Sequence, residues 1–257
     1  MKHKIPKVKS IDIDNCETTD GLINQFKSSG VFGAGRIAKS VDIYSQMLDE
    51  KAEVFLGIAG ALVPGGMRNV ITKMIREDMV SVIVSTGANV THDLIEAFGG
   101  EHVRNVEYKS DQELRDKSID RIYDAFVGDD SFMKMEDHIQ PIFEEIYTKH
   151  KNQHNQLILP TYKLLNLIGE KLSDSSSFVR AAYEKNIPIF VPAFGDSITG
   201  LQLWLFSQLK QVYIDIMDDL SKIQQLARDA EKAGTIFLGG GVPKNYIFQS
   251  RLISPKS

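Results

Sequence analysis

The sequence has little cysteine, no block of like charge and no long apolar run, and each absence excludes a class of protein. Cys16 is the only cysteine in 257 residues, which excludes an intramolecular disulfide framework and a cysteine-rich zinc site. Thirty basic and thirty-four acidic residues carry a net charge of −4 without a run of one sign, so a nucleic-acid partner is not indicated. No segment reaches the roughly 18–20 apolar residues that cross a bilayer, and the basic opening lacks a signal-peptide core. We therefore expect a folded cytoplasmic protein without a membrane or nucleic-acid partner.

The composition is that of an ordinary folded domain, with 42% hydrophobic and 25% charged residues. Five runs are nearly continuous in Val, Ile, Leu and Phe: Glu53–Gly57, Val80–Ser85, Ile187–Pro192, Val212–Met217 and Thr235–Leu238. Such runs are typical of strands buried on both faces of a parallel sheet. Helical patterns lie between them, at Gly66–Asp78, His92–Phe98, Ser176–Asn186 and Leu220–Ala233. This alternation predicts an α/β fold in which helices flank a parallel sheet.

The middle of the chain, residues 101–172, is less regular. Helical pieces around Phe132–Lys149 and Tyr162–Leu172 are interrupted by polar stretches. No Gly-, Ser- or Pro-rich linker separates this part from the rest. We therefore interpret it as a helical insertion that packs on the sheet, and residues 1–257 as a single domain.

Glycines concentrate where the predicted strands end, in residues 57–66, 86–89, 193–200 and 239–245. Ligands of α/β sheets bind beyond the strand ends, and glycine lets the backbone approach a ligand closely. Amides at the start of a helix then receive phosphate oxygens. Four such turns favour a nucleotide or another elongated phosphorylated ligand, although tight strand–helix turns explain the glycines of any single loop equally well.

Residues 33–38, with the sequence GAGRIA, match the loose dinucleotide pattern G-x-G-x-x-A. That pattern requires a preceding buried strand, but the polar segment QFKSSG precedes it, and no acidic residue follows at the expected spacing. We interpret this stretch as a loop and the beginning of a helix that runs to Asp49.

Three further side chains are candidates for chemistry, each with an ordinary alternative. Asp196 could accept ribose hydroxyls or pair with an ammonium group, or it could cap a turn or helix. His92, near a predicted helix start, could be a base, a polar contact or a surface residue. Lys244 could contact a phosphate or lie in solvent. The histidines lack metal-ligand spacing, so we expect no metal site.

Taken together, four segments resemble the deoxyhypusine synthase family, in particular its archaeal-type members. They are EVFLGIAGALVPGGMRNVI, VSVIVSTGANVTHDLIEAFGG, IPIFVPAFGDSITGLQ and GTIFLGGGVPKNYI. The resemblance runs in the same order from about Gly21 to the C-terminus. It implies a Rossmann-like NAD-binding domain and an NAD-dependent transferase that forms homotetramers, with active sites at a dimer interface.

Members of this family oxidise spermidine by hydride transfer to NAD and pass its aminobutyl group through an enzyme-lysine imine. The acceptor is one lysine of the translation factor 5A precursor, which becomes deoxyhypusine. The resemblance therefore implies NAD as cofactor, and spermidine and the factor precursor as partners.

The resemblance also assigns residues. Cofactor contacts fall on Gly60, Ala61, Leu62, Val63, Pro64, Thr86, Gly87, Ala88, Asp196 and Gly240. His92 stands where eukaryotic members carry a glutamate near cofactor and spermidine, and Asn245 where they carry a polyamine-contacting histidine, so we expect both to contact substrate. Leu201 replaces a second carboxylate. These three departures affect the part of the site that would bind the polyamine, because a polycation binds best to carboxylates.

The catalytic lysine of the family lies in a Ser-Trp-Gly-Lys segment, and these 257 residues contain none. The single tryptophan, Trp204, lies in LQLWLF, and Lys244 precedes the catalytic position in family order. We therefore assign no catalytic residue and expect the C-terminal part of the family domain to be missing. Three functions stay open: a deoxyhypusine synthase, a related transferase with a free-amine acceptor such as homospermidine synthase, and a non-catalytic subunit that binds NAD or a full-length partner.

Overall fold

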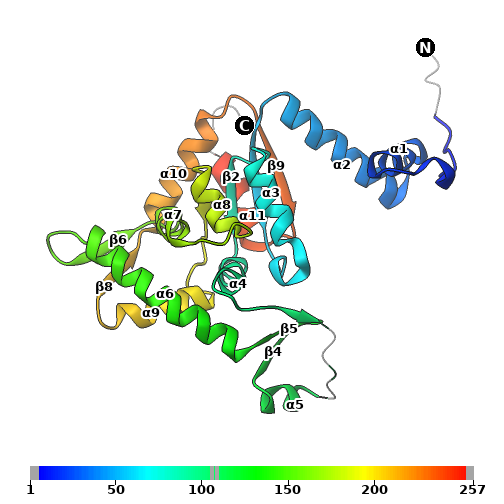
Figure 1. The fold of residues 1–257 in the computed structure, drawn as a ribbon. Helices are drawn as coiled ribbons and strands as arrows, with labels where there is room; N and C mark the ends of the chain where they lie inside the picture. The colour runs from blue at the N-terminus through cyan, green and yellow to red at the C-terminus, as the bar shows by residue number, and fades with distance from the viewer. Residues whose placement is uncertain (1–5, 105–106, 108–109, 253–257) are drawn as a thin grey trace. The chain divides into compact units, whose positions relative to one another are not determined.

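The computed structural model describes residues 6–104, 107 and 110–252, which divide after Ala52 into two compact units (Figure 1). The first unit contains a short 3-10 turn, η1 (Ile13–Asn15), and two packed helices, α1 (Thr19–Ser29) and α2 (Phe32–Asp49). Helix α1 begins after Thr18, whose hydroxyl accepts a hydrogen bond from the Gly21 amide at 3.0 Å. Helix α1 is followed directly by α2, which contains the GAGRIA sequence of residues 33–38, so no strand precedes this sequence in the described residues. The predicted helix that ends at Asp49 is confirmed, but the predicted loop is wrong, because α2 begins at Phe32 and residues 33–38 are helical throughout.

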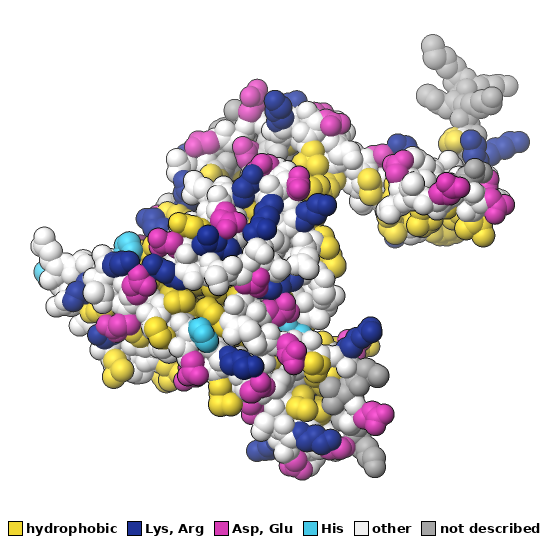
Figure 2. Space-filling model, in the orientation of Figure 1, with side chains coloured by type: hydrophobic (Ala, Val, Ile, Leu, Met, Phe, Trp, Pro, Cys, Tyr) yellow, Lys and Arg dark blue, Asp and Glu magenta, His cyan; other side chains and the backbone are white. Residues whose placement is uncertain are grey.

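The first unit buries little of its apolar surface by itself. Ala38 is the one buried residue of α2, and α1 has none among the residues described. Figure 2 shows apolar side chains gathered along one side of this unit. Exposed apolar residues on its two helices are Leu22, Phe32, Ile37, Val41 and Ile43. Two helices of this kind gain little stability from packing on each other alone.

The second unit is built on a parallel sheet, as the continuous apolar runs predict. In their order across the sheet, its strands are β7 (Ile189–Phe190), β2 (Val82–Ser85), β1 (Glu53–Ile58) and β9 (Ala233–Leu238). Phe55 of β1 lies beside Val82 on one side and Thr235 on the other. Every residue of β1 after Glu53 is buried. The predicted α/β fold with a helix-flanked parallel sheet is confirmed.

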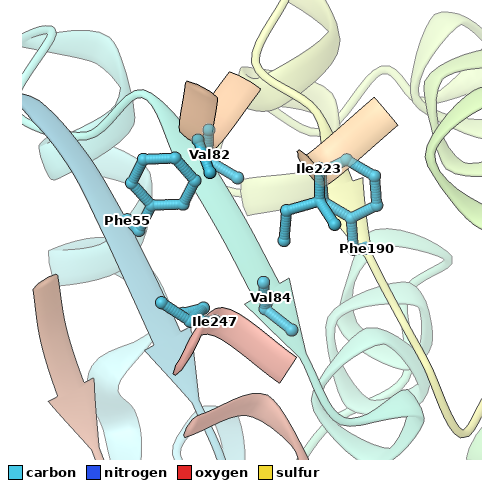
Figure 3. Close-up of a cluster of buried hydrophobic side chains, with 7 residues drawn as sticks. Phe55, Val82, Val84, Phe190, Ile223 and Ile247 are labelled. Carbon is cyan, nitrogen blue, oxygen red and sulfur yellow. The ribbon is translucent and has the colours of Figure 1, made fainter. Parts of the chain in front are cut away.

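Helices cover both faces of this sheet (Figure 1). On one face, Phe55, Val82, Val84 and Phe190 pack against Ile223 and Ile247, which come from two helices (Figure 3). Each fully buried side chain of this size stabilises the fold by roughly 1.5–3 kcal/mol. Between and after these strands the chain forms α3 (Arg68–Arg76), α4 (Gly87–Ala97), α8 (Phe178–Glu184), α9 (Ile198–Ser207), α10 (Ile216–Asp229) and α11 (Gly241–Leu252).

The predicted strand Val212–Met217 is shorter and lies elsewhere. It forms β8 (Gln211–Ile214), which pairs in parallel with β6 (Gln156–Leu159) in a separate two-stranded sheet. The run ends early because the Asp215 carboxylate accepts hydrogen bonds from the Met217 and Asp218 amides and so begins α10.

Residues 101–172 contain the two predicted helices, α6 (Asp129–His150) and α7 (Thr161–Lys171), and also strands that the pattern did not predict. Besides β6, an antiparallel sheet has the order β3 (Val103–Arg104), β5 (Ala125–Gly128) and β4 (Ile119–Ile122), next to the short helix α5 (Asp111–Asp116). These strands are short, and β4 is only partly buried, so they lack a long apolar run.

The four strands of the central sheet are parallel, so their carboxyl ends meet at one edge. Ile58, Ser85, Phe190 and Leu238 therefore direct the chain into turns on the same side of the sheet. That edge is where ligands of parallel α/β sheets bind. No helix in the described part of the chain has the length and hydrophobicity of a membrane span.

Candidate functional site

A pocket of about 310 Å³ lies at this edge, and the turns after all four strands line it. Its lining includes five residues assigned from the sequence: Gly60, Thr86, Gly87, Asp196 and Gly240. The rest of the lining is Ala59, Ser85, Ala193, Gly239, Gly241, Val242 and Pro243. Ala59 and Pro243, which are 184 residues apart in the sequence, are thus brought into one small cavity. Its size falls at the lower end of the range for small-molecule sites.

Only the first residues of the turn after β1 line the pocket. Gly60 has a φ of +79°, which a side chain would strain, and it lines the cavity. The next residues turn away from the lining: Ala61 is exposed, Leu62 and Pro64 are half-buried and Val63 is buried. They lead into the short helical turn η2 (Val63–Met67).

Asn89 of α4 holds this turn in place, although the sequence did not single it out. Its side-chain oxygen accepts hydrogen bonds from the amides of Leu62 and Val63 at 3.2 and 3.4 Å. Its side-chain nitrogen donates to Thr86 Oγ1 at 3.1 Å. Asn89 is fully buried, so it connects the turns after β1 and β2 where water does not compete.

The start of α4 offers backbone amides to the pocket. Thr86 is the residue before the helix, and its side chain does not cap the amides of the first turn. Such amides, at the positive end of the helix dipole, bind anions. Gly87 lies so close to Ser197 that a Cβ at this position would come within 2.5 Å of its hydroxyl oxygen. This contact joins the turn after β2 to the loop after β7, while Ala88 is exposed outside the pocket lining.

Asp196 does not cap a helix, so the helix-capping alternative given for it above is wrong. Ser197 caps α9, with its hydroxyl accepting from the Gly200 amide at 3.0 Å. No described residue donates a hydrogen bond to the Asp196 carboxylate, which lines the pocket. Across the cavity, Gly239 has a φ of +87°, and a Cβ on Gly240 would have no atom within 4 Å. The pocket therefore combines an unpaired carboxylate with an open glycine surface.

A buried ion cluster lies behind α4 and ties three helices together. Arg68 Nε is 2.6 Å from Asp93 Oδ1, and its Nη1 is 2.7 Å from Asp174 Oδ2. The Asp93 side chain is 0% exposed and also accepts hydrogen bonds from the Ser177 hydroxyl and the amides of Phe178 and Val179. Burial raises the pKa of Asp93, while the Arg68 guanidinium and the Ser177 hydroxyl oppose that shift and favour the carboxylate.

His92 lies on the same helix, and a chain of hydrogen bonds connects it to this cluster. His92 Nδ1 is 2.9 Å from His102 Nε2, and His102 Nδ1 is 2.7 Å from Glu96 Oε1. Burial, and then the neighbouring His102, lower the pKa of His92 to about 4. The imidazole of His92 is therefore neutral near pH 7.

The other predicted substrate residue, Asn245, is exposed on α11 and does not line the pocket. Lys244 is half-buried and also lies outside the lining, although the preceding Val242 and Pro243 are part of it. Leu201 is exposed on α9. The structure thus gathers the predicted cofactor residues more closely than the predicted substrate residues.

Comparison with known proteins points to one family. The family described as "Deoxyhypusine synthase" matches residues 21–256. A protein named "Probable deoxyhypusine synthase" from Methanosarcina thermophila is 40% identical over 251 residues, which are 97% of this chain and 76% of that protein. Another of that name, from Methanothermobacter thermautotrophicus, is 34% identical over 95% of this chain and 79% of its own length.

A solved structure shares the fold. A crystal structure of a protein assigned as a deoxyhypusine synthase from Entamoeba histolytica aligns with a TM-score of 0.67. The alignment covers 91% of this chain and 82% of that one at 20% identity, so this likeness concerns the fold alone. The sequence relatives confirm the resemblance drawn from the four strand-end segments.

Proposed function

The chain belongs to the deoxyhypusine synthase family, and from this premise we propose that it transfers the aminobutyl group of spermidine to a lysine of the translation factor 5A precursor, with NAD as cofactor. One observation carries this proposal. Turns from four parallel strands converge on a single glycine-rich pocket that holds an unpaired carboxylate. This is the kind of cavity in which α/β folds bind nucleotides.

The residues present fit NAD. The amides at the start of α4 would receive phosphate oxygens, because the Thr86 side chain does not cap them. Asp196 would accept hydrogen bonds from ribose hydroxyls, because its carboxylate has no partner among the described residues. Gly60 and Gly240 leave room for a ligand, since a Cβ built on either meets no atom within 4 Å. Thr86 and Gly87 complete the proposed set, whereas Ala61, Leu62, Val63, Pro64 and Ala88 lie outside the lining of this pocket.

Bound NAD would supply the hydride acceptor that oxidation of an amine requires. The chain itself would position the two ligands. Asp196 and the α4 amides would fix the cofactor, while His92 and Asn245 would contact the polyamine with uncharged groups. We assign no nucleophile, because no lysine in the 257 residues follows a Ser-Trp-Gly sequence.

We also propose that the protein forms a homotetramer. Helix α9 exposes Ile198, Leu201, Trp204 and Leu205, and Trp204 is 55% exposed. Neighbouring exposed apolar side chains of this kind commonly mark protein–protein contacts. Sedimentation equilibrium measures the assembly, and a monomer at micromolar concentration would contradict this part of the proposal.

Calorimetric titration with NAD tests the cofactor site. Replacing Asp196 with Ala should weaken binding about ten- to a hundred-fold, as expected for loss of a hydrogen bond to a charged group. Gly240→Val should block the pocket without straining the backbone, because its Cβ has open space and its φ is not positive. Gly33→Val is the matched control, since Gly33 also has no atom near its Cβ and lies in the other unit. Unchanged affinity in Asp196→Ala and Gly240→Val would contradict the assignment.

The acceptor is tested separately with spermidine labelled in its aminobutyl group. Transfer of label to the factor 5A precursor supports the proposed reaction. The alternative acceptor, a free amine, has support in the residues that replace carboxylates on the polyamine side, His92 and Leu201. Transfer to putrescine but not to the precursor would favour that reaction instead, and NAD binding without any transfer would leave only a binding role.

A further inference from the structure

Glu96, His102 and His92 form a chain of hydrogen bonds that leaves His92 Nε2 without a hydrogen-bond partner among the described residues. We propose that this chain fixes His92 as a neutral hydrogen-bond acceptor for an amine N–H of the substrate, with His102 and Glu96 as its positioning residues. The identity of the substrate rests on the proposed function. The state of the His92 ring does not, and it can be measured without any ligand.

The two hydrogen bonds determine which ring nitrogens carry protons. A carboxylate only accepts, so the 2.7 Å contact with Glu96 requires a proton on His102 Nδ1. A neutral imidazole carries one proton, so His102 Nε2 has a free lone pair and accepts from His92 Nδ1–H at 2.9 Å. The neutral His92 ring then has no proton on Nε2. That nitrogen is an acceptor and a base, as in sites where a second group sets the tautomer of a histidine.

Charged groups behind the chain hold it in place. The second oxygen of Glu96 is 3.4 Å from Arg68 Nη1, and Arg68 is itself anchored by Asp93 and Asp174. The His102 side chain is only 6% exposed, so water competes little for its ring nitrogens. The two imidazole rings lie 4.9 Å apart at an interplanar angle of 67°. The chain therefore runs from a buried guanidinium to a histidine that is partly open to solvent.

Helix α4 connects this histidine to the cofactor pocket. His92 follows Gly87, which lines the pocket, by five residues, or about 7.5 Å along the helix axis. Ala88, His92 and Glu96 are four residues apart, so they share one face of α4, and Ala88 is exposed. No described residue forms a hydrogen bond with His92 Nε2. A ligand that extended from the pocket along this face would pass His92.

The chemistry suits an amine. An unprotonated Nε2 accepts a hydrogen bond from an amine or ammonium N–H, and a neutral ring does not repel a polycation. A histidine with its proton on Nε2 would instead present a donor, which a protonated amine cannot use. Setting the tautomer thus gives His92 an acceptor nitrogen for an amine N–H.

Nitrogen-15 NMR of the histidine rings in the full chain tests the tautomer, at about pH 8 and without ligand. Wild-type His92 should carry its proton on Nδ1. His102→Leu removes the acceptor and should shift His92 toward the Nε2–H form. His102→Gln should restore the wild-type state, because its amide can donate to Glu96 and accept from His92. A wild-type ring protonated on Nε2, or the same tautomer in His102→Leu, would overturn the inference.

Titration with spermidine in the presence of NAD then tests the use of this nitrogen. Loss of one hydrogen bond should weaken spermidine binding about three- to ten-fold in His102→Leu, with NAD affinity unchanged. His102→Gln should bind as the wild type does. Equal spermidine affinity in all three proteins would overturn the acceptor role. If the wild type bound neither ligand, the proposed function would fail while the NMR result still decided the state of the ring.

Discussion

We expect removal of the Arg68 charge to lower the free energy of unfolding more than removal of any other basic side chain of α3. Arg68→Met keeps most of the length of the side chain but leaves the Asp93 carboxylate without its guanidinium partner. The Asp93 side chain is 0% exposed, and that of Arg68 only 9%. Breaking a buried pair from one side typically costs about 3–5 kcal/mol, because the remaining charge stays desolvated.

Arg76→Met is the matched control on the same helix. Arg76 pairs with Glu184 at 3.2 Å, but both side chains are 38% exposed. An exposed pair of this kind contributes about 0–1 kcal/mol. The two variants therefore change the same residue type in the same helix and differ in burial.

Urea unfolding followed by circular dichroism measures both losses. Arg68→Met should lower the free energy of unfolding by at least about 2 kcal/mol more than Arg76→Met does. The double variant Arg68→Met with Asp93→Asn should recover part of that loss, since it also removes the unpaired charge. Equal losses in Arg68→Met and Arg76→Met would refute the reasoning from burial.

Two further substitutions test other parts of the site. The pKa of His92 is about 4 in the folded protein and about 6.5 in the unfolded chain, so the unfolded state binds the proton first as the pH falls. The free energy of unfolding should therefore drop by up to about 3 kcal/mol between about pH 6.5 and 4. His92→Asn should reduce this dependence of the unfolding free energy on pH, while His154→Gln, at an exposed position, should not. An unchanged pH dependence in His92→Asn would contradict the account. Asn89→Ala should cost about 1–3 kcal/mol in the same assay, because the Leu62 and Val63 amides lose their acceptor, whereas Asn89→Asp keeps that oxygen and should cost less.

The fold was predictable where the strands are buried on both faces. The run Glu53–Gly57 is apolar almost throughout, and it forms a central strand one residue longer than expected. The run Ile187–Pro192 yielded only two strand residues, because prolines at 188 and 192 have no amide proton for the ladder. The strands Ile119–Ile122 and Gln156–Leu159 were missed because each has only four residues and some of these are polar, so neither forms an apolar run that predicts a strand.

The cofactor side of the site was predictable because parallel strands bring their carboxyl ends together. The ion cluster was not, since Arg68, Asp93 and Asp174 are separated by 25 and 81 residues and no local pattern pairs them. The partnership of His92 with His102 depends on how the chain returns after α4, which sequence spacing does not reveal. Asn89 could have been suspected only from its place within a turn rich in small residues.

Hydrogen exchange of the full chain with and without NAD, read by mass spectrometry, tests the central claim most directly. The account predicts slower exchange in four separated segments, residues 59–67, 85–92, 193–200 and 239–245, because the turns after β1, β2, β7 and β9 form one cofactor site. Two other cavities serve as internal references, one lined by Asp111, Arg115, Arg121 and Asp129 and one lined by Leu159, Tyr162, Ile187 and Lys222. Protection confined to either reference cavity, or no protection at saturating NAD, would contradict the account.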